Sequence, residues 1–184
     1  RNAPPVFMLG SSEVTVLFHD GRVEANTDFP SGFKSPAGHN LPEGLENILA
    51  VQAMFPVTSD AEMAGQPKEN EVANAAAVGP VGVWSLLADR LRAIPAYVNL
   101  FTDAFDDINS AGDITYAHAA NAIAAFEIDS WRADNSPWDA YQAGNYQALN
   151  KIEQDGSKLF FGKAGCSSCH SGDVFSDMQF HAIA

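Results

Sequence analysis

Apolar side chains recur at helical spacing in four stretches of the chain. The first stretch covers residues 42–55. Its members at i, i+3, i+4 and i+7 are Leu45, Ile48, Leu49 and Gln52. This spacing predicts an amphipathic helix with one face buried. Gln52 falls on that face, where a polar side chain calls for an explanation.

Three more helices are predicted further along the chain. Residues 83–94 repeat the spacing, and Pro95 suits the first turn of a following helix. That helix carries one row of mostly apolar side chains, which are Tyr97, Leu100, Phe101, Ala104, Phe105 and Ile108. The last helix covers residues 114–131, and Asp113 in front of it is expected to be its N-cap.

Strand signals are weak, and much of the remaining chain predicts loops. Residues 13–18 are typical of one short strand, while Gly, Pro, Asn and Ser are frequent elsewhere in the first 42 residues. A second stretch rich in turn formers follows Trp131 and predicts a domain boundary. The expected fold class is mainly α, with helical domains, long loops and little strand, divided into residues 1–134 and 135–184.

Composition and charge narrow the classes of partner. The chain has 184 residues, with 23 acidic against 10 basic side chains and a formal net charge of −13. This balance argues against a nucleic-acid or anionic-membrane surface and suits either a basic protein partner or simple solvation. No stretch approaches the roughly 20 apolar residues of a membrane span, and the first residues lack a signal-peptide pattern. We therefore expect a soluble chain whose export signal lies upstream.

Both cysteines of the chain lie in the segment AGCSSCH, Ala164–His170. A thiol redox pair at this spacing would need a strand before it and a helix after it, and the flanking sequence does not supply them. A zinc site needs four ligands, and His39, His118 and His181 are not at finger spacing from the pair. Zinc is therefore a weak alternative.

The order Cys166, Cys169, His170 is typical of a c-type haem attachment site. Two thiols form thioethers with the haem vinyl groups, and the imidazole that follows reaches the iron. A chance pair of cysteines is the competing interpretation. Because c-type haem is attached beyond the bacterial inner membrane, the motif predicts a periplasmic protein.

Five blocks, in this order, carry a family resemblance. They are RNAP at 1–4, LFHDGR at 17–22, VQAMFPVTSDAEMAG at 51–65, NSPWDAYQAGNYQAL at 135–149 and GCSSCHSGDVFSDMQFHAIA at 165–184. The chain resembles the bacterial di-haem cytochrome c peroxidases, including the related enzymes that mature methylamine dehydrogenase. The resemblance implies a first haem motif upstream and further chain downstream, so this sequence is expected to be an internal fragment.

The same resemblance implies the fragment's domain content. Residues 1–134 would belong to the N-terminal domain that holds the peroxide-binding haem. Residues 135–184 would begin the C-terminal domain, with the second haem motif and the haem that receives electrons. The sixth ligand of that haem would come from downstream.

The resemblance implies roles for four further residues. Gln52 and Glu62 match a glutamine and, ten residues later, a glutamate that acts as acid and base on peroxide. Asn2 matches an asparagine that ligates calcium between the haem domains. His19 stands where the family usually has a tryptophan between the haems. An imidazole is harder to oxidise than an indole, so tunnelling past His19 and a role as haem ligand are the alternatives to electron hopping through it. A surface carboxylate, a loop asparagine and a packing histidine are the competing interpretations.

Side chains around the haem motif have simpler expected roles. Phe160, Phe161 and Phe175 would pack on the porphyrin or on a protein core. Met178 follows His170 by only eight positions, too near in the chain to reach the opposite haem face. We therefore expect Met178 and His181 to be structural.

Together these features predict a periplasmic oxidoreductase with haem c, one on this chain and a second in the full-length protein, and with calcium as a further ion. A cytochrome c or cupredoxin would donate electrons, and hydrogen peroxide would be reduced to water. Two alternatives stay open: oxidation of a side chain in a partner protein, and a mono-haem electron-transfer module. The resemblance is also compatible with a homodimer.

Overall fold

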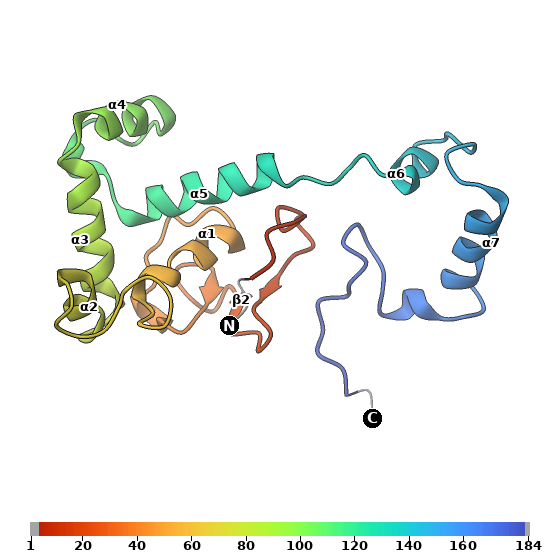
Figure 1. Cartoon of the computed structure of the whole chain (residues 1–184), viewed down its shortest axis with the longest axis horizontal. Coiled ribbons are helices and arrows are strands. Elements are labelled where there is room, and N and C mark those ends of the chain that lie inside the picture. The colour runs from red at the N-terminus through yellow and green to blue at the C-terminus, as the bar shows by residue number, and fades with distance from the viewer. Residues whose placement is uncertain (1–3, 183–184) are drawn as a thin grey trace. The chain divides into compact units, whose positions relative to one another are not determined.

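The computed structural model describes residues 4–182, which fall into two compact units. The central unit covers residues 16–126, and the terminal unit combines the chain up to Thr15 with the chain from Glu127 onward. The prediction of a mainly helical chain with little strand is confirmed (Figure 1). The assignment of residues 1–134 and 135–184 to two haem domains stays a prediction.

Helices dominate both units. The α-helices are α1 (Ile48–Ala53), α2 (Glu71–Ala76), α3 (Pro80–Arg92), α4 (Pro95–Ala104), α5 (Tyr116–Ser130), α6 (Pro137–Gln142) and α7 (Lys151–Phe160). The 3-10 turns are η1 (Gly38–Asn40), η2 (Pro56–Thr58), η3 (Ala111–Asp113) and η4 (Cys166–Ser168). Among the described residues, no helix combines the length and the apolar character that crossing a bilayer requires.

A small antiparallel sheet begins the central unit. Its strands β1 (Val16–Leu17), β2 (Val23–Ala25) and β3 (Phe33–Lys34) pair in chain order. Leu17 lies opposite Val23, which is fully buried. The strand predicted over residues 13–18 is thus confirmed only at its end.

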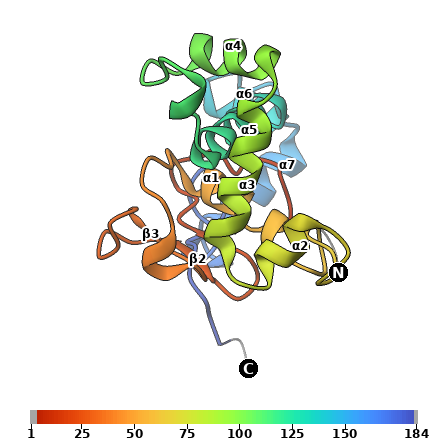
Figure 2. The ribbon, with the colours of Figure 1, turned by 90° about the vertical axis from the view of Figure 1, so that its left-hand side faces the viewer.

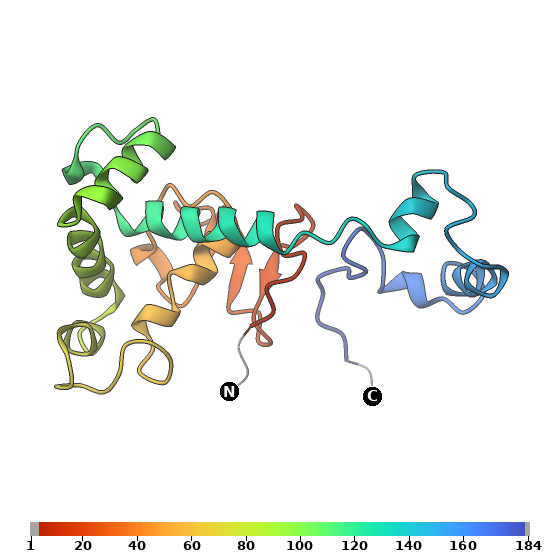
Figure 3. The ribbon, with the colours of Figure 1, turned by 45° about the horizontal axis from the view of Figure 1, so that its top comes forward.

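Helix α1 lies at the centre of this unit's core. It is shorter than predicted because Asn47 adopts an extended conformation and caps it, its side chain accepting a hydrogen bond from the Ala50 N–H (3.0 Å). The predicted buried face is confirmed, since Leu45, Ile48, Leu49 and Gln52 are all buried. Figures 1 and 3 show α5 running alongside α1.

Helices α3 and α4 confirm the next two predictions in part. Figure 2 shows α3 running from α2 to α4, and the Trp84 indole N–H of α3 donates to the Met54 carbonyl just after α1 (2.8 Å). Helix α4 ends at Ala104 because Phe105 is extended, so Phe105 and Ile108 lie beyond the helix that was expected to carry them. Tyr97 on α4 is exposed.

The predicted N-cap of α5 is wrong. Asp113 lies in η3, where its carboxylate and the Ser110 side chain form a capping box, and α5 begins at Tyr116. The hydrogen bond from the Ser110 hydroxyl, followed by those from backbone N–H groups, lowers the pKa of Asp113. At the start of α5, the Thr115 N–H donates to His118 Nδ1 (2.9 Å), so the His118 Nε2–H donates to Asp107 (3.2 Å).

The terminal unit contains α6 and α7, which periodicity did not predict. Each follows a capping box, Ser136 with Asp139 and Asn150 with Glu153. Among the described residues of this unit, the buried apolar side chains are Val14 and Leu149. Most of the unit's apolar surface is therefore open to solvent or to a further group.

Candidate functional site

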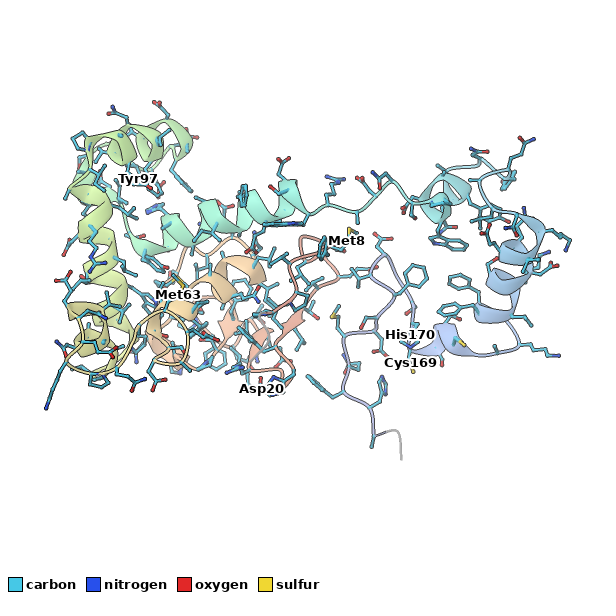
Figure 4. The ribbon with its side chains drawn as sticks, viewed as in Figure 1. Met8, Asp20, Met63, Tyr97, Cys169 and His170 are labelled. Carbon is cyan, nitrogen blue, oxygen red and sulfur yellow. The ribbon has the colours of Figure 1, made fainter. Side chains whose placement is uncertain are left out.

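The cysteine motif forms a tight turn in the terminal unit. Gly165 adopts the left-handed conformation (φ 71°) that opens η4, and the N–H groups of Cys169 and His170 both approach the Cys166 carbonyl (3.3 and 3.0 Å). Both thiols are free and partly exposed. Cys169 and His170 lie at the end of this turn (Figure 4), so two thiols and an imidazole are offered by one turn.

His170 is held in one tautomer. Its Nδ1 lies 3.1 Å from the Phe175 carbonyl oxygen. Because a carbonyl can only accept, Nδ1 carries the proton and Nε2 is left with its lone pair. A metal-ligating histidine is commonly held in this way, with one nitrogen bonded to the protein and the other directed at the metal.

An aromatic cluster borders the motif. Its members are Trp138 and Tyr141 of α6, Phe160 and Phe161 around the end of α7, and Phe175. Trp138 stacks on Phe161 with ring centroids 5.3 Å apart, and Phe160 lies 6.3 Å from the His170 ring. Phe161 and Phe175 are 46% and 39% exposed.

This exposed cluster tests whether the motif fits a haem. A flat apolar group seated on the two cysteines and His170 would cover aromatic rings that the described part of the terminal unit leaves open. Such a lining is what a buried porphyrin requires. The residues present therefore fit the haem that the motif implies.

Two further potential ligands lie beside Cys169, which the sequence spacing did not indicate. The ligand atoms of Cys169, Asp177 and His181 all lie within 4.8 Å of one another. The Asp177 N–H donates to the Cys169 carbonyl (2.9 Å), and His181 Nε2 lies 2.8 Å from Asp177 Oδ2. The N–H of Gln179 and then the His181 side chain lower the pKa of Asp177. A metal bound here would need the same sulfur that a thioether uses, so the two uses exclude each other.

Gln52 differs from the other buried amide of the central unit. Both polar atoms of the Asn121 side chain are hydrogen-bonded: its Oδ1 accepts from the Glu46 N–H (3.1 Å) and its Nδ2 donates to the Gly44 carbonyl (2.8 Å). Gln52 is 8% exposed, and within residues 4–182 no hydrogen bond of its side chain is found. Since no fully enclosed side-chain nitrogen or oxygen there lacks a partner, the Gln52 amide reaches accessible space.

Glu62 lies in an exposed turn after η2, in the same segment of chain. The turn is held by backbone hydrogen bonds, from the Met63 N–H to the Pro56 carbonyl (3.1 Å) and from the Ala64 N–H to the Ser59 carbonyl (3.0 Å). Met63, labelled in Figure 4, is 67% exposed. No hydrogen bond within the described residues joins Glu62 to Gln52.

The two remaining candidates are placed as follows. His19 is exposed in the turn between β1 and β2, where the Arg22 guanidinium lies over the Phe18 ring (4.5 Å) and pairs with Asp20 (3.1 Å). Its role between haems stays a prediction. Asn2 lies outside the described residues, so the calcium role also stays a prediction.

Residues 1–147 match the family model of the di-haem cytochrome c peroxidases, so the chain belongs to this family of c-type cytochromes. The resemblance inferred from the five sequence blocks is thereby confirmed. The matched range ends before the cysteine motif, so the geometry of the motif described above is independent of the match.

Named relatives agree with this assignment. The Methylamine utilization protein MauG of Methylorubrum extorquens is 32% identical over 141 residues, covering 77% of this chain and 34% of that protein. The Cytochrome c551 peroxidase of Pseudomonas aeruginosa is 30% identical over 130 residues, covering 71% of this chain and 32% of that protein. The Cytochrome-c peroxidase IdrP2 of Pseudomonas sp. (strain SCT) is 38% identical over 96 residues, covering 52% and 24%. The chain thus spans about a third or less of the length of these relatives.

Proposed function

We propose that the whole protein is a periplasmic di-haem oxidoreductase that reduces hydrogen peroxide to water with electrons from a small redox protein. The observation that carries the proposal is Gln52, a buried amide that the described fold does not use, in a segment that matches the family. An electron-transfer module without chemistry of its own has no evident need for such a group.

In this proposal Cys166 and Cys169 attach one haem and the His170 Nε2 ligates its iron. Bound haem supplies an iron that exchanges single electrons. The Phe175 carbonyl keeps the proton on His170 Nδ1, which makes Nε2 a better donor. The aromatic cluster excludes water from that face.

Peroxide reduction consumes two protons and two electrons and yields two waters, so the reaction needs groups that position peroxide and move protons. The Gln52 amide can donate a hydrogen bond to a peroxide oxygen from a buried position. Glu62 can carry a proton from one oxygen to the other. Because Glu62 is exposed in this chain, the proposal requires that another part of the whole protein covers it during the reaction.

The charge of the chain bears on the electron donor. A net charge of −13 would attract a basic cytochrome c or cupredoxin and speed its approach. We also propose that Asn2 ligates calcium.

A second candidate is oxidation of a side chain in a partner protein. It is favoured by the similarity to a relative whose name assigns it to methylamine utilisation. The two candidates differ in the final electron source, which is a soluble redox protein in the first and the partner's side chain in the second.

Replacing Glu62 by Gln in the full-length protein with its haems tests the proposal. Loss of proton transfer should lower peroxide turnover by about 10²-fold or more, while the visible spectrum of the haem on Cys166 and Cys169 stays unchanged. Asp60→Asn, an exposed carboxylate close by in the chain, is the matched control and should keep normal turnover. Equal turnover in both variants would remove Glu62 from the reaction.

A further inference from the structure

The Glu13 carboxylate binds the loop that follows the haem motif. Its Oε2 accepts hydrogen bonds from the N–H groups of Asp173 (2.6 Å) and Val174 (3.3 Å), across a separation of 160 and 161 residues. The approach is so close that a Cβ at position 172 would collide with this oxygen. Gly172 also has a φ of 71°, so two conditions at this position favour glycine.

The arrangement is an anion-binding nest made by successive backbone N–H groups. Hydrogen bonds to a charged acceptor are stronger than neutral ones, so the carboxylate fixes the loop more firmly than an amide–carbonyl contact would. The Phe175 N–H closes the same loop onto the Gly172 carbonyl (3.4 Å). Glu13 therefore contacts Val174, the residue directly before Phe175, and the Phe175 carbonyl holds His170.

The loop contacts the His170 imidazole through Phe175. The Phe175 carbonyl accepts the hydrogen bond from His170 Nδ1 (3.1 Å), and Phe175 itself is in a left-handed conformation (φ 51°) that few non-glycine residues adopt. A conformation of this kind persists only where its surroundings hold it. The nest around Glu13 is one such restraint.

We infer that Glu13 is a positioning residue for the haem ligand His170, acting through the loop 172–175. The inference rests on the proposed haem attachment. With Glu13 in place, the carbonyl stays aligned with Nδ1–H and increases the donor strength of Nε2, which favours the oxidised iron. Without it, the loop relaxes, the ligand weakens and the reduction potential rises.

The test compares Glu13→Ala and Glu13→Gln in the full-length protein with its haems. Two quantities are measured: the reduction potential of the haem on Cys166 and Cys169, and the hydrogen exchange of the amides in residues 172–175. Glu13→Ala should raise the potential and speed exchange at Asp173 and Val174 by about tenfold or more. Glu13→Gln keeps an acceptor oxygen at the same reach and should restore most of both. Asp129→Ala, another exposed carboxylate of this unit, is the control for charge alone.

Two results of this experiment would overturn the inference about Glu13. An unchanged potential in Glu13→Ala overturns the inference, whether exchange rises or not, because the contact would then not act on the ligand. An equal shift in Asp129→Ala also overturns it, since general charge would explain the result. If Glu13→Ala does not fold, Glu13→Asp, which keeps the charge but shortens the reach to the loop, takes its place: faster exchange at Asp173 together with a raised potential supports the inference, and wild-type values of both overturn it. Absence of haem on the wild-type motif would instead refute the proposed function.

Discussion

Gln52 and Asn121 are the two buried polar side chains among the described residues, and replacing each by leucine separates a structural amide from a functional one. Leucine has a similar volume and no polar atom. In Asn121→Leu the Glu46 N–H and the Gly44 carbonyl lose their partners. Two hydrogen bonds at about 1 kcal/mol each, with part of the cost of leaving both groups unpaired, give about 2–3 kcal/mol. In Gln52→Leu no such bond is lost, and the change should be below about 1 kcal/mol.

Hydrogen exchange of the amides in α1 and α5, followed by mass spectrometry in the full-length protein, measures this difference locally. A loss of 2–3 kcal/mol corresponds to exchange about 30- to 150-fold faster, and Gln52→Leu should stay within about fivefold of wild type. Peroxide turnover should show the opposite order, with a loss of at least about tenfold only in Gln52→Leu, since removal of a positioned donor commonly costs 10² or more. The reasoning would be refuted if Gln52→Leu destabilised the unit as strongly as Asn121→Leu, or if its turnover were normal.

Two further predictions concern the core and the aromatic cluster. Burial raises the pKa of Tyr116 to about 12 against an ordinary value of 10.0. Its neutral form therefore stabilises the fold below pH 10, and that contribution is lost as the pH rises from about 10 to 12. An ultraviolet titration should show this tyrosine ionising last, and Tyr116→Phe should reduce the loss of stability over this pH range. Trp138→Ala removes the ring that stacks on Phe161 and Tyr141, so water should reach the haem face and the reduction potential should fall. Trp138→Phe keeps an aromatic ring and should preserve the potential. Equal potentials in the two variants would contradict a role for the cluster.

Periodicity was sufficient to predict the helices whose apolar face is continuous. The buried face that includes Gln52 follows directly from the 3.6-residue repeat, and α3 and α5 were found in the same way. The exact limits depended on local hydrogen bonds instead, so Asn47 begins α1 later than expected and Ser110 draws Asp113 into η3. Helix α6 was missed because its signal lies in the capping box of Ser136 with Asp139. Helix α7 does carry apolar side chains at helical spacing, Ile152, Leu159 and Phe160, but six polar or glycine residues separate the first from the others and the spacing was not recognised.

The candidate site divides in the same manner. The order of two cysteines and a histidine is a local pattern, so the sequence alone indicated haem attachment. The bond from His170 to the Phe175 carbonyl depends on a left-handed residue that periodicity does not signal, and the contact of Glu13 joins segments at opposite ends of the chain. Pairings over such separations follow from tertiary structure and cannot be inferred from one sequence.

The close approach of Gly172 to Glu13 constrains how the gene can change. A side chain at position 172 would push the Glu13 carboxylate away from the loop and would also have to adopt the left-handed backbone conformation, so a change at 172 breaks the contact that Glu13 makes. A change at position 13 removes the carboxylate but leaves the backbone requirement at 172 in place. Among divergent copies of this protein, glycine should therefore persist at 172 wherever position 13 keeps its glutamate, although more than 150 residues of chain separate them.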